Sequence, residues 1–161
     1  MVMKGTKKKA FTLIEVLMIV AIIGTLLALI VPSYTNLLEK AKVNHVISEI
    51  VKISRELDDF LIDNGTLPET LDELIQNSNK PLNLIDPWGN PYAYLVILGK
   101  DKNEIQGIWR KDRFLVPINA DYDLYSMGKD GVSTAPLTAQ ASHDDIIRAN
   151  NGGYFGLAHK Y

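Results

Sequence analysis

The chain has 161 residues, 47% of them hydrophobic and 22% charged, which suits one compact domain with an appendage. It contains no cysteine, which excludes a disulfide framework and a thiolate metal site. Four of the 17 basic residues lie within the first ten positions. The remaining 13 face 19 acidic residues, so the rest of the chain carries a formal charge of −6. Because an acidic surface repels phosphate backbones, we expect no nucleic acid partner.

Residues 11–31 form an apolar segment that reads FTLIEVLMIVAIIGTLLALIV and contains one charged side chain, Glu15. At about 1.5 Å per residue a helix of this length spans roughly 30 Å, the thickness of a bilayer core. The lysines before it favour a cytoplasmic N-terminus, which places the rest of the chain on the other side of the membrane.

Two simpler interpretations of this segment fit the residues less well. A cleaved secretory signal peptide has a shorter apolar core, and residues 31–33 lack the A-x-A spacing of its cleavage site. A plain membrane anchor leaves Glu15 unexplained, because a carboxylate inside an apolar helix costs about 2.5 to 3.5 kcal/mol.

The stretch KKKAFTLIEVLMIVAIIGTLLALIVPSY resembles the N-terminal signature of type IV pilins and type II secretion pseudopilins. The resemblance implies a cytoplasmic leader at residues 1–10, cleaved between Ala10 and Phe11 by a prepilin peptidase, and N-methylation of Phe11. It also implies a transmembrane and filament-core helix at residues 11–32 and a periplasmic pilin-like domain at residues 33–161. Glu15 and Pro32 stand where the family has Glu and Pro, whereas Ala10 replaces the usual Gly.

Glu15 is a candidate assembly residue because a charge buried in hydrocarbon needs a partner. The amine of Phe11 on a neighbouring subunit can compensate its carboxylate, and this pairing would set the axial register of a filament. Gly24 and Pro32 weaken the helix locally, since Gly is a poor helix former and Pro removes a hydrogen bond.

After Pro32 a second amphipathic stretch runs to about residue 62, with apolar residues at helical spacing and a stop signal at Asn64-Gly65. Its apolar stripe needs a sheet to cover it. The T-x-x-E spacing of Thr66 and Glu69 predicts a capping box that opens a short helix to about residue 76.

The remaining elements are strands and turns. The turn-rich residues 86–91 precede a predicted strand at 92–98, and a loop at 99–103 leads to a second at 104–110. A third strand is expected at 122–126. The fold class is therefore α+β, with a long N-terminal helix packed on a small antiparallel sheet and a C-terminal loop region.

Three stretches, LDDFLIDNGTLPETLDELI, DPWGNPYAYL and DYDLYSMGKDG, resemble the major, G-type pseudopilins of type II secretion systems. Together with the N-terminal signature, they occur in the expected order across most of the chain. Residues 100–120 do not match that pattern, and they form a longer connection than is usual in the family.

Asp130, Asp144 and Asp145 are separated by a loop rich in Gly, Ser and Thr, and oxygen ligands of this kind suit calcium. The alternative is structural, because Asp-Gly pairs are common in turns and Asp144-Asp145 can cap a helix at residues 144–149. The resemblance implies a structural calcium ion bound by these three side chains and by carbonyls of Met127 and Ser133. The spacer between Asp130 and Asp144 departs from the family in length and sequence.

No catalytic chemistry is expected. His45, His143 and His159 are far apart in sequence, fit no metal-binding spacing and are predicted to be surface residues. The chain lacks a G-x-S-x-G motif, a phosphate loop and a catalytic cysteine.

The resemblance implies a homo-oligomeric filament, anchored through a single span in the bacterial inner membrane and extending into the periplasm, which helps to export folded proteins. Its implied partners are the prepilin peptidase, an inner-membrane assembly platform and minor pseudopilins. The alternatives are a structural pilin of a surface type IV pilus and a monomeric membrane-anchored binding module.

Overall fold

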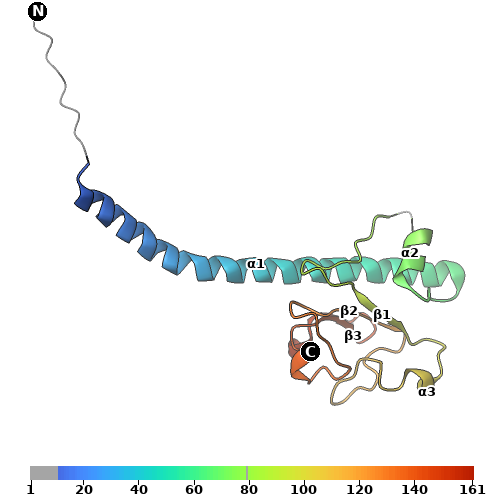
Figure 1. Cartoon of the computed structure of the whole chain (residues 1–161). Helices are drawn as coiled ribbons and strands as arrows, with labels where there is room; N and C mark the ends of the chain where they lie inside the picture. Colours follow the sequence, from blue (N-terminus) through green and yellow to red (C-terminus); the bar gives the residue numbers. More distant parts are fainter. Residues whose placement is uncertain (1–10, 79) are drawn as a thin grey trace, which may run out of the picture. The chain divides into compact units, whose positions relative to one another are not determined.

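The structure is a computed structural model that describes residues 11–78 and 80–161 (Figure 1). The chain divides into two units, with the boundary between Lys40 and Ala41. The long helix α1 (Leu13–Asn64) contributes to both units, and all other helices and strands belong to the second.

Helix α1 is continuous through Pro32, so the two helical stretches predicted on either side of this residue are one element. The helix ends where the sequence predicts. Gly65 donates its backbone N–H to the Leu61 carbonyl at 2.9 Å, and it adopts a φ of +75°, a conformation that glycine reaches without steric cost.

Four strands form one antiparallel sheet in the order β1-β2-β3-β4. The strands are β1 (Ala93–Val96), β2 (Tyr122–Ser126), β3 (Ile146–Ala149) and β4 (Tyr154–Leu157). Tyr94 pairs with Leu124, Tyr125 with Ile147, and Ile147 with Gly156. The predicted α+β architecture with a small antiparallel sheet is confirmed.

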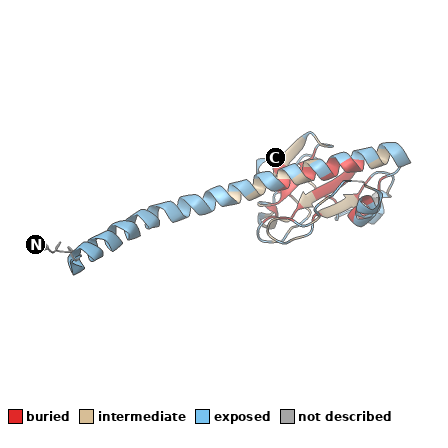
Figure 2. Ribbon diagram, turned by 90° about the horizontal axis from the view of Figure 1, so that it is seen from above, coloured by how far each residue is buried: buried red, intermediate tan, exposed pale blue. Residues whose placement is uncertain are grey.

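One face of the sheet is covered by the second half of α1 (Figure 2). Its predicted apolar stripe is confirmed, because Ile50, Ile53 and Leu57 are fully buried against Leu124 and Ile146. Each such side chain contributes about 1.5–3 kcal/mol by leaving water. Helix α2 (Leu71–Asn77) adds its two buried leucines to the same core.

The opposite face, which we call the loop face, is covered by irregular chain. Because side chains alternate along a strand, Ile147 and Ala149 of β3 point away from α1. They pack with Ile118, Leu137 and Ala158 in a second buried cluster. The long connection between β1 and β2 and the loop between β2 and β3 therefore share one small core.

The strand predicted at residues 104–110 is wrong. These residues contain the end of a short helix, α3 (Lys102–Ile105), and a turn. Asp101 caps α3 by accepting a hydrogen bond from Asn103 N at 2.9 Å, and Gly107 has a φ of +91° that breaks any regular strand. Ile105 and Trp109, four residues apart, are buried together with Ile97.

The predicted start of the short helix at residues 66–76 is also wrong, and the alternative helix at residues 144–149 does not form. The cap of α2 is Thr70 rather than Thr66, since the Thr70 hydroxyl accepts from Glu73 N at 3.2 Å. The T-x-x-E spacing occurs twice, and the second copy directly precedes the helix. Asp144-Asp145 does not open a helix either, because these residues lead into strand β3.

Candidate functional site

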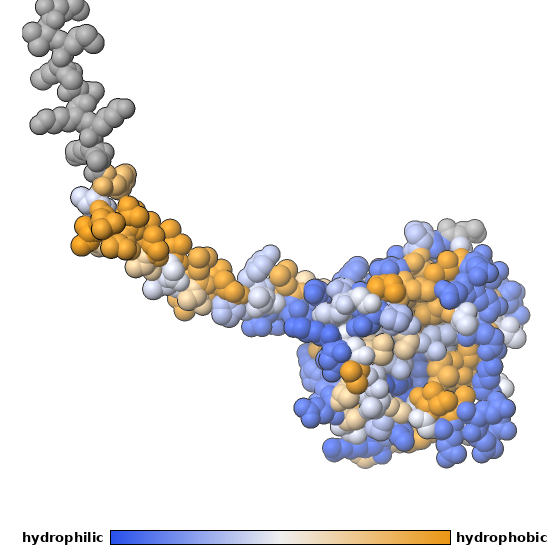
Figure 3. All heavy atoms as spheres, viewed as in Figure 1, coloured by the Kyte–Doolittle hydropathy of each residue, from blue (hydrophilic) through white to orange (hydrophobic). Residues whose placement is uncertain are grey.

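The first functional feature is the apolar N-terminal half of α1. Residues 11–38 are all exposed, and the sphere view shows hydrophobic residues covering this half (Figure 3). Among the described residues, α1 is the one helix long and apolar enough to cross a membrane. The apolar window of α1 is exposed on all sides in the isolated chain, whereas the apolar side chains of a soluble helix pack against a core, so this half suits a membrane span.

Glu15 closes the N-terminal turn of α1 through a reciprocal capping box. Thr12 donates its backbone N–H and its hydroxyl to Glu15 Oε2, at 2.9 and 2.8 Å. Glu15 N in turn donates to Thr12 Oγ1 at 3.3 Å, and the Thr12 carbonyl accepts from Val16 N. The sequence signal for this contact is the T-x-x-E spacing of residues 12–15.

The structure brings together some of the predicted processing and assembly residues. Phe11 directly precedes the capping box and is 76% exposed. Pro32 lies inside α1, 17 residues after Glu15, or about 25 Å along a helix. Ala10, the predicted residue before the cleavage, lies outside the described residues.

The second feature is the loop between β2 and β3, which is bonded to the turn before β1. Asp86 Oδ1 accepts from Trp88 N at 3.0 Å and from Asn90 N at 2.9 Å, and its Oδ2 accepts from Ser126 Oγ at 2.7 Å. Asn90 Nδ2 donates to the Gly128 carbonyl at 3.0 Å. Hydrogen bonds therefore join the DPWGNP and SMGKDG stretches, although Asp86 and Ser126 are 40 residues apart in the sequence.

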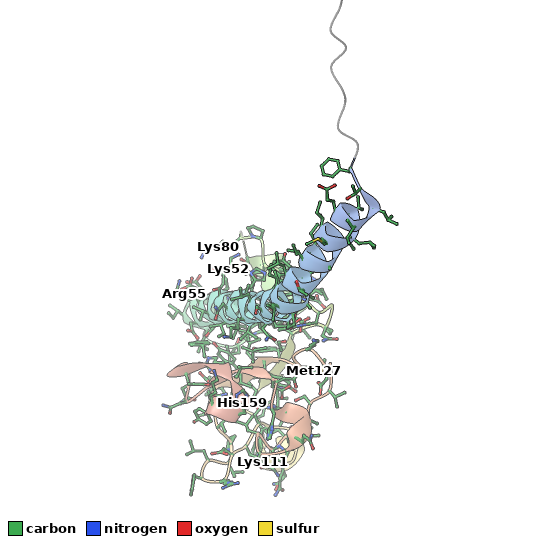
Figure 4. All side chains as sticks on the ribbon, turned by 90° about the vertical axis from the view of Figure 1, so that its left-hand side faces the viewer. Lys52, Arg55, Lys80, Lys111, Met127 and His159 are labelled. Carbon is green, nitrogen blue, oxygen red and sulfur yellow. The ribbon has the colours of Figure 1, made fainter. Side chains whose placement is uncertain are left out.

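The predicted metal ligands in this loop are engaged in other hydrogen bonds. Asp144 Oδ2 accepts from the backbone N–H groups of Lys129 and Asp130, at 2.9 and 3.2 Å. Asp130 Oδ1 accepts from Val132 N at 2.8 Å, which makes a local turn. Met127 is half-buried at the start of the loop (Figure 4).

Asp145 is fully buried and paired with a cation from elsewhere in the chain. Its Oδ2 accepts from Arg110 Nη2 and, at 2.6 Å, from Ser133 Oγ. Burial raises the pKa of Asp145, while the bonds from Ser133 and Arg110 act in the opposite direction.

Within residues 11–78 and 80–161, no group of three or more His, Cys, Asp or Glu side chains is arranged to hold a metal ion. Asp145 is paired with Arg110, and Asp130 and Asp144 bond backbone N–H groups. The side chains as described therefore do not offer the shared set of acidic oxygens that calcium requires. Calcium binding stays a prediction.

Arg110 is the site residue that sequence reasoning missed. It lies in the stretch 100–120, which matched no pattern, and nothing in the spacing of its neighbours marks it as buried. Only the fold brings it to Asp145, 35 residues further along the chain. The three histidines are exposed, as predicted. His159 Nδ1 lies 2.8 Å from the His143 carbonyl (Figure 4).

Comparison with known proteins assigns the family. The family described as type II secretion system (T2SS), protein G, matches residues 33–144, and the prokaryotic N-terminal methylation motif matches residues 5–31. This motif implies processing by a prepilin peptidase. Together with the apolar half of α1, it identifies a membrane-anchored protein with a single span. No solved structure gives a significant match.

Several curated relatives are named type II secretion system core protein G. The protein from Pseudomonas aeruginosa is 33% identical over 145 residues, which cover 80% of this chain and 89% of the relative. The protein from Escherichia coli K12 is 32% identical over 141 residues, or 78% and 84% of the two chains. The Vibrio cholerae protein is 34% identical over 107 residues, or 57% and 73%. The chain therefore belongs to the type II secretion system protein G family.

Proposed function

We propose that this chain is the structural subunit of a type II secretion pseudopilus, a filament that grows from the inner membrane into the periplasm and helps to export folded proteins. The observation that carries the proposal is the match of both parts of the chain, in order, to the methylation motif and to the protein G family. A surface pilin would share the first match but not the second.

The exposed apolar half of α1 supports assembly through this helix. In the membrane lipid covers its side chains, and in a filament the same helices of neighbouring subunits cover them. The subunit performs no chemistry in this proposal. Its partners are other copies of itself, the prepilin peptidase, the inner-membrane assembly platform and minor pseudopilins.

Glu15 has two successive partners in this scheme. Before assembly its carboxylate caps its own helix through Thr12. In the filament it pairs with the methylated Phe11 amine of a neighbouring subunit, because an uncompensated carboxylate among packed apolar helices is costly.

The Glu15→Gln variant tests this role, since glutamine is close in size and removes only the charge. We expect normal membrane insertion and a normally folded body, but no filaments when the subunit is overproduced. Asp63→Asn, at an exposed carboxylate near the other end of α1, is the matched control and should assemble normally. Abundant filaments from Glu15→Gln would contradict the assembly role.

A clean deletion in the source bacterium tests the function itself. Loss of specific secreted proteins with intact surface pili would support the secretion proposal, and complementation with the wild-type chain should restore secretion. Missing pili with unchanged secretion would instead assign the chain to a surface pilus.

A further inference from the structure

A buried arginine lies under the loop between β2 and β3, on the loop face of the sheet. Only 2% of Arg110 is exposed. Its Nη2 donates to Asp145 Oδ2, and its Nη1 donates to Ser133 Oγ and to the Thr134 carbonyl. The guanidinium carbon also lies 4.3 Å from the centroid of the Tyr125 ring, a cation–π distance. The guanidinium is thus held by oxygens and by an aromatic face.

The oxygens around Arg110 are of the kinds that calcium binds: a carboxylate, a hydroxyl and a backbone carbonyl. Two of their residues, Asp145 and Ser133, belong to the calcium ligand set predicted from the sequence. Asp145 Oδ1 and Arg110 Nε are both buried without a hydrogen-bond partner among the described residues. Arg110 is the cation that is bonded to the buried carboxylate of Asp145, through Oδ2. A divalent ion at the same carboxylate would lie close to the guanidinium and be repelled by it.

Arg110 reaches this position because two unusual segments of the chain bond to each other. Lys111 N donates to the Ala135 carbonyl at 3.1 Å, and Leu137 N donates to the Lys111 carbonyl at 2.9 Å. The adjacent Arg110 N donates to the buried Asp123 Oδ2 at 2.6 Å. Residues 100–120 and the spacer between Asp130 and Asp144 are two stretches that differ from the G-type pattern in the sequence, and these backbone bonds join them.

We propose that the Arg110 guanidinium is a permanent internal cation that closes the loop between β2 and β3 in place of a calcium ion. The long connection before β2 supplies the cation, and the long loop after β2 supplies the oxygens. A loop closed in this way folds and stays closed whether or not calcium is present.

The first test is the thermal unfolding of the full-length chain in a mild detergent, with calcium chloride or with a chelator. The two tryptophans of the chain, Trp88 and Trp109, both lie in the unit from Ala41 to Tyr161, so their fluorescence reports on that unit. We expect the same Tm in both solutions. A loop closed by calcium would instead gain roughly 10 °C at a 100-fold excess of calcium over its Kd, and that gain would overturn the proposal.

The second test measures the coupling between Arg110 and Asp145 in a double-mutant cycle. Arg110→Met leaves a buried carboxylate without its cation, and we expect Tm to fall by roughly 10–20 °C. Adding Asp145→Asn should recover at least half of that loss. Arg113→Met, the same change at an exposed arginine nearby, is the matched control and should leave Tm unchanged. The proposal would be overturned if the loss of Tm in the double variant equalled the sum of the losses in Arg110→Met and Asp145→Asn. If Arg110→Met does not fold, the comparison with and without calcium decides.

Discussion

The carboxylate of Glu56 is held near the C-terminal end of α1 by a basic side chain from beyond α2. Only 10% of the Glu56 side chain is exposed. It accepts from Lys80 Nζ and, at 3.0 Å, from Ser78 Oγ. The bond from Lys80 lowers the pKa of Glu56 below its usual value, and the same bond raises the pKa of Lys80. Lys52, four residues earlier on α1, also lowers the pKa of Glu56 through its charge.

These shifts predict how the free energy of unfolding depends on pH. A carboxyl group with a lowered pKa in the folded state stabilises the fold above its unfolded pKa of about 4.3, and this contribution is lost as pH falls through the lowered value. A lysine with a raised pKa stabilises the fold below its unfolded pKa of about 10.4, and that contribution is lost as pH rises through the raised value. The Glu56–Lys80 pair therefore stabilises the body most between these limits.

Lys80→Met should accordingly destabilise the body at neutral pH, and the difference from wild type should shrink toward zero below about pH 4. Urea unfolding followed by tryptophan fluorescence at a series of pH values measures this. Lys160→Met changes an exposed lysine near the C-terminus and serves as the control. An equal loss at pH 3 and pH 7 would mean that the effect of Lys80 is not electrostatic.

A second buried arginine, Arg148, ties α1 to the sheet. It donates to both carboxylate oxygens of Asp121, at 2.8 and 2.6 Å, and its Nε donates to Ser54 Oγ at 3.2 Å. Ser54 Oγ also lies 2.8 Å from the Tyr122 hydroxyl. This network explains a serine inside the apolar stripe of α1, because its hydroxyl has partners on the facing strands.

At the scale of elements, the loop after β2 depends on a glycine that is close to the backbone of another segment. Gly128 has a φ of +66°, and a Cβ at this position would lie 2.4 Å from the Asp144 carbonyl oxygen and 2.6 Å from Asp144 Oδ2. Gly107 also has a positive φ, +91°, but no atom lies within 4 Å of the corresponding Cβ position. Substitutions at the two glycines therefore distinguish the cost of backbone strain from the cost of steric overlap.

Gly107→Ala should cost about 1–2 kcal/mol of unfolding free energy, the strain of a left-handed conformation alone. Gly128→Ala adds overlap with Asp144 and should cost about 2–5 kcal/mol in total. Urea unfolding of the two variants side by side measures the difference. Equal losses would show that Gly128 and Asp144 do not approach each other as the structure describes.

The elements that sequence reasoning predicted well are those with strong local signals. The stripe from Val46 to Leu57 repeats at helical spacing, and the aromatic and branched residues of β1 and β2 lie between clear turns. The strand prediction at 104–110 was wrong because it relied on the apolar residues of this stretch. Ile105 and Trp109 are apolar, but the residues between them do not alternate as in a strand, and Gly107 turns the chain. Strand β4 was not predicted, since Tyr154–Leu157 is short and depends on pairing with β3.

The candidate site was predictable only in part, and for a related reason. The chemistry of Glu15 follows from one charge within an apolar run, which a sequence shows directly. The partner of Asp145 cannot be found from the sequence in this way, because the contact with Arg110 depends on two irregular segments and on the register of β2 and β3. A carboxylate in a loop has the same sequence signal whether its cation is a metal ion or an arginine.

At the scale of the whole molecule, the residues suited to anchor the chain in a membrane are different from the residues that form its folded core. Every buried core residue lies between Val46 and Ala158 among the described residues, within the second unit. The apolar half of α1 adds nothing to these cores, so changes before Lys40 should leave the stability of the body unaltered. Membrane insertion, processing and assembly can therefore be tested without unfolding the protein.

Processing of the N-terminus is the last prediction. The mature subunit should have the mass of residues 11–161 plus one methyl group, which intact-mass spectrometry measures. Ala10→Gly should speed the conversion in a pulse–chase experiment, because a peptidase pocket suited to glycine has to accommodate the additional methyl group of alanine. The urea unfolding of the body should be the same in both proteins. A subunit that keeps residues 1–10 in its filaments would show that the chain assembles without cleavage, and the pairing of Glu15 with the Phe11 amine would then be impossible.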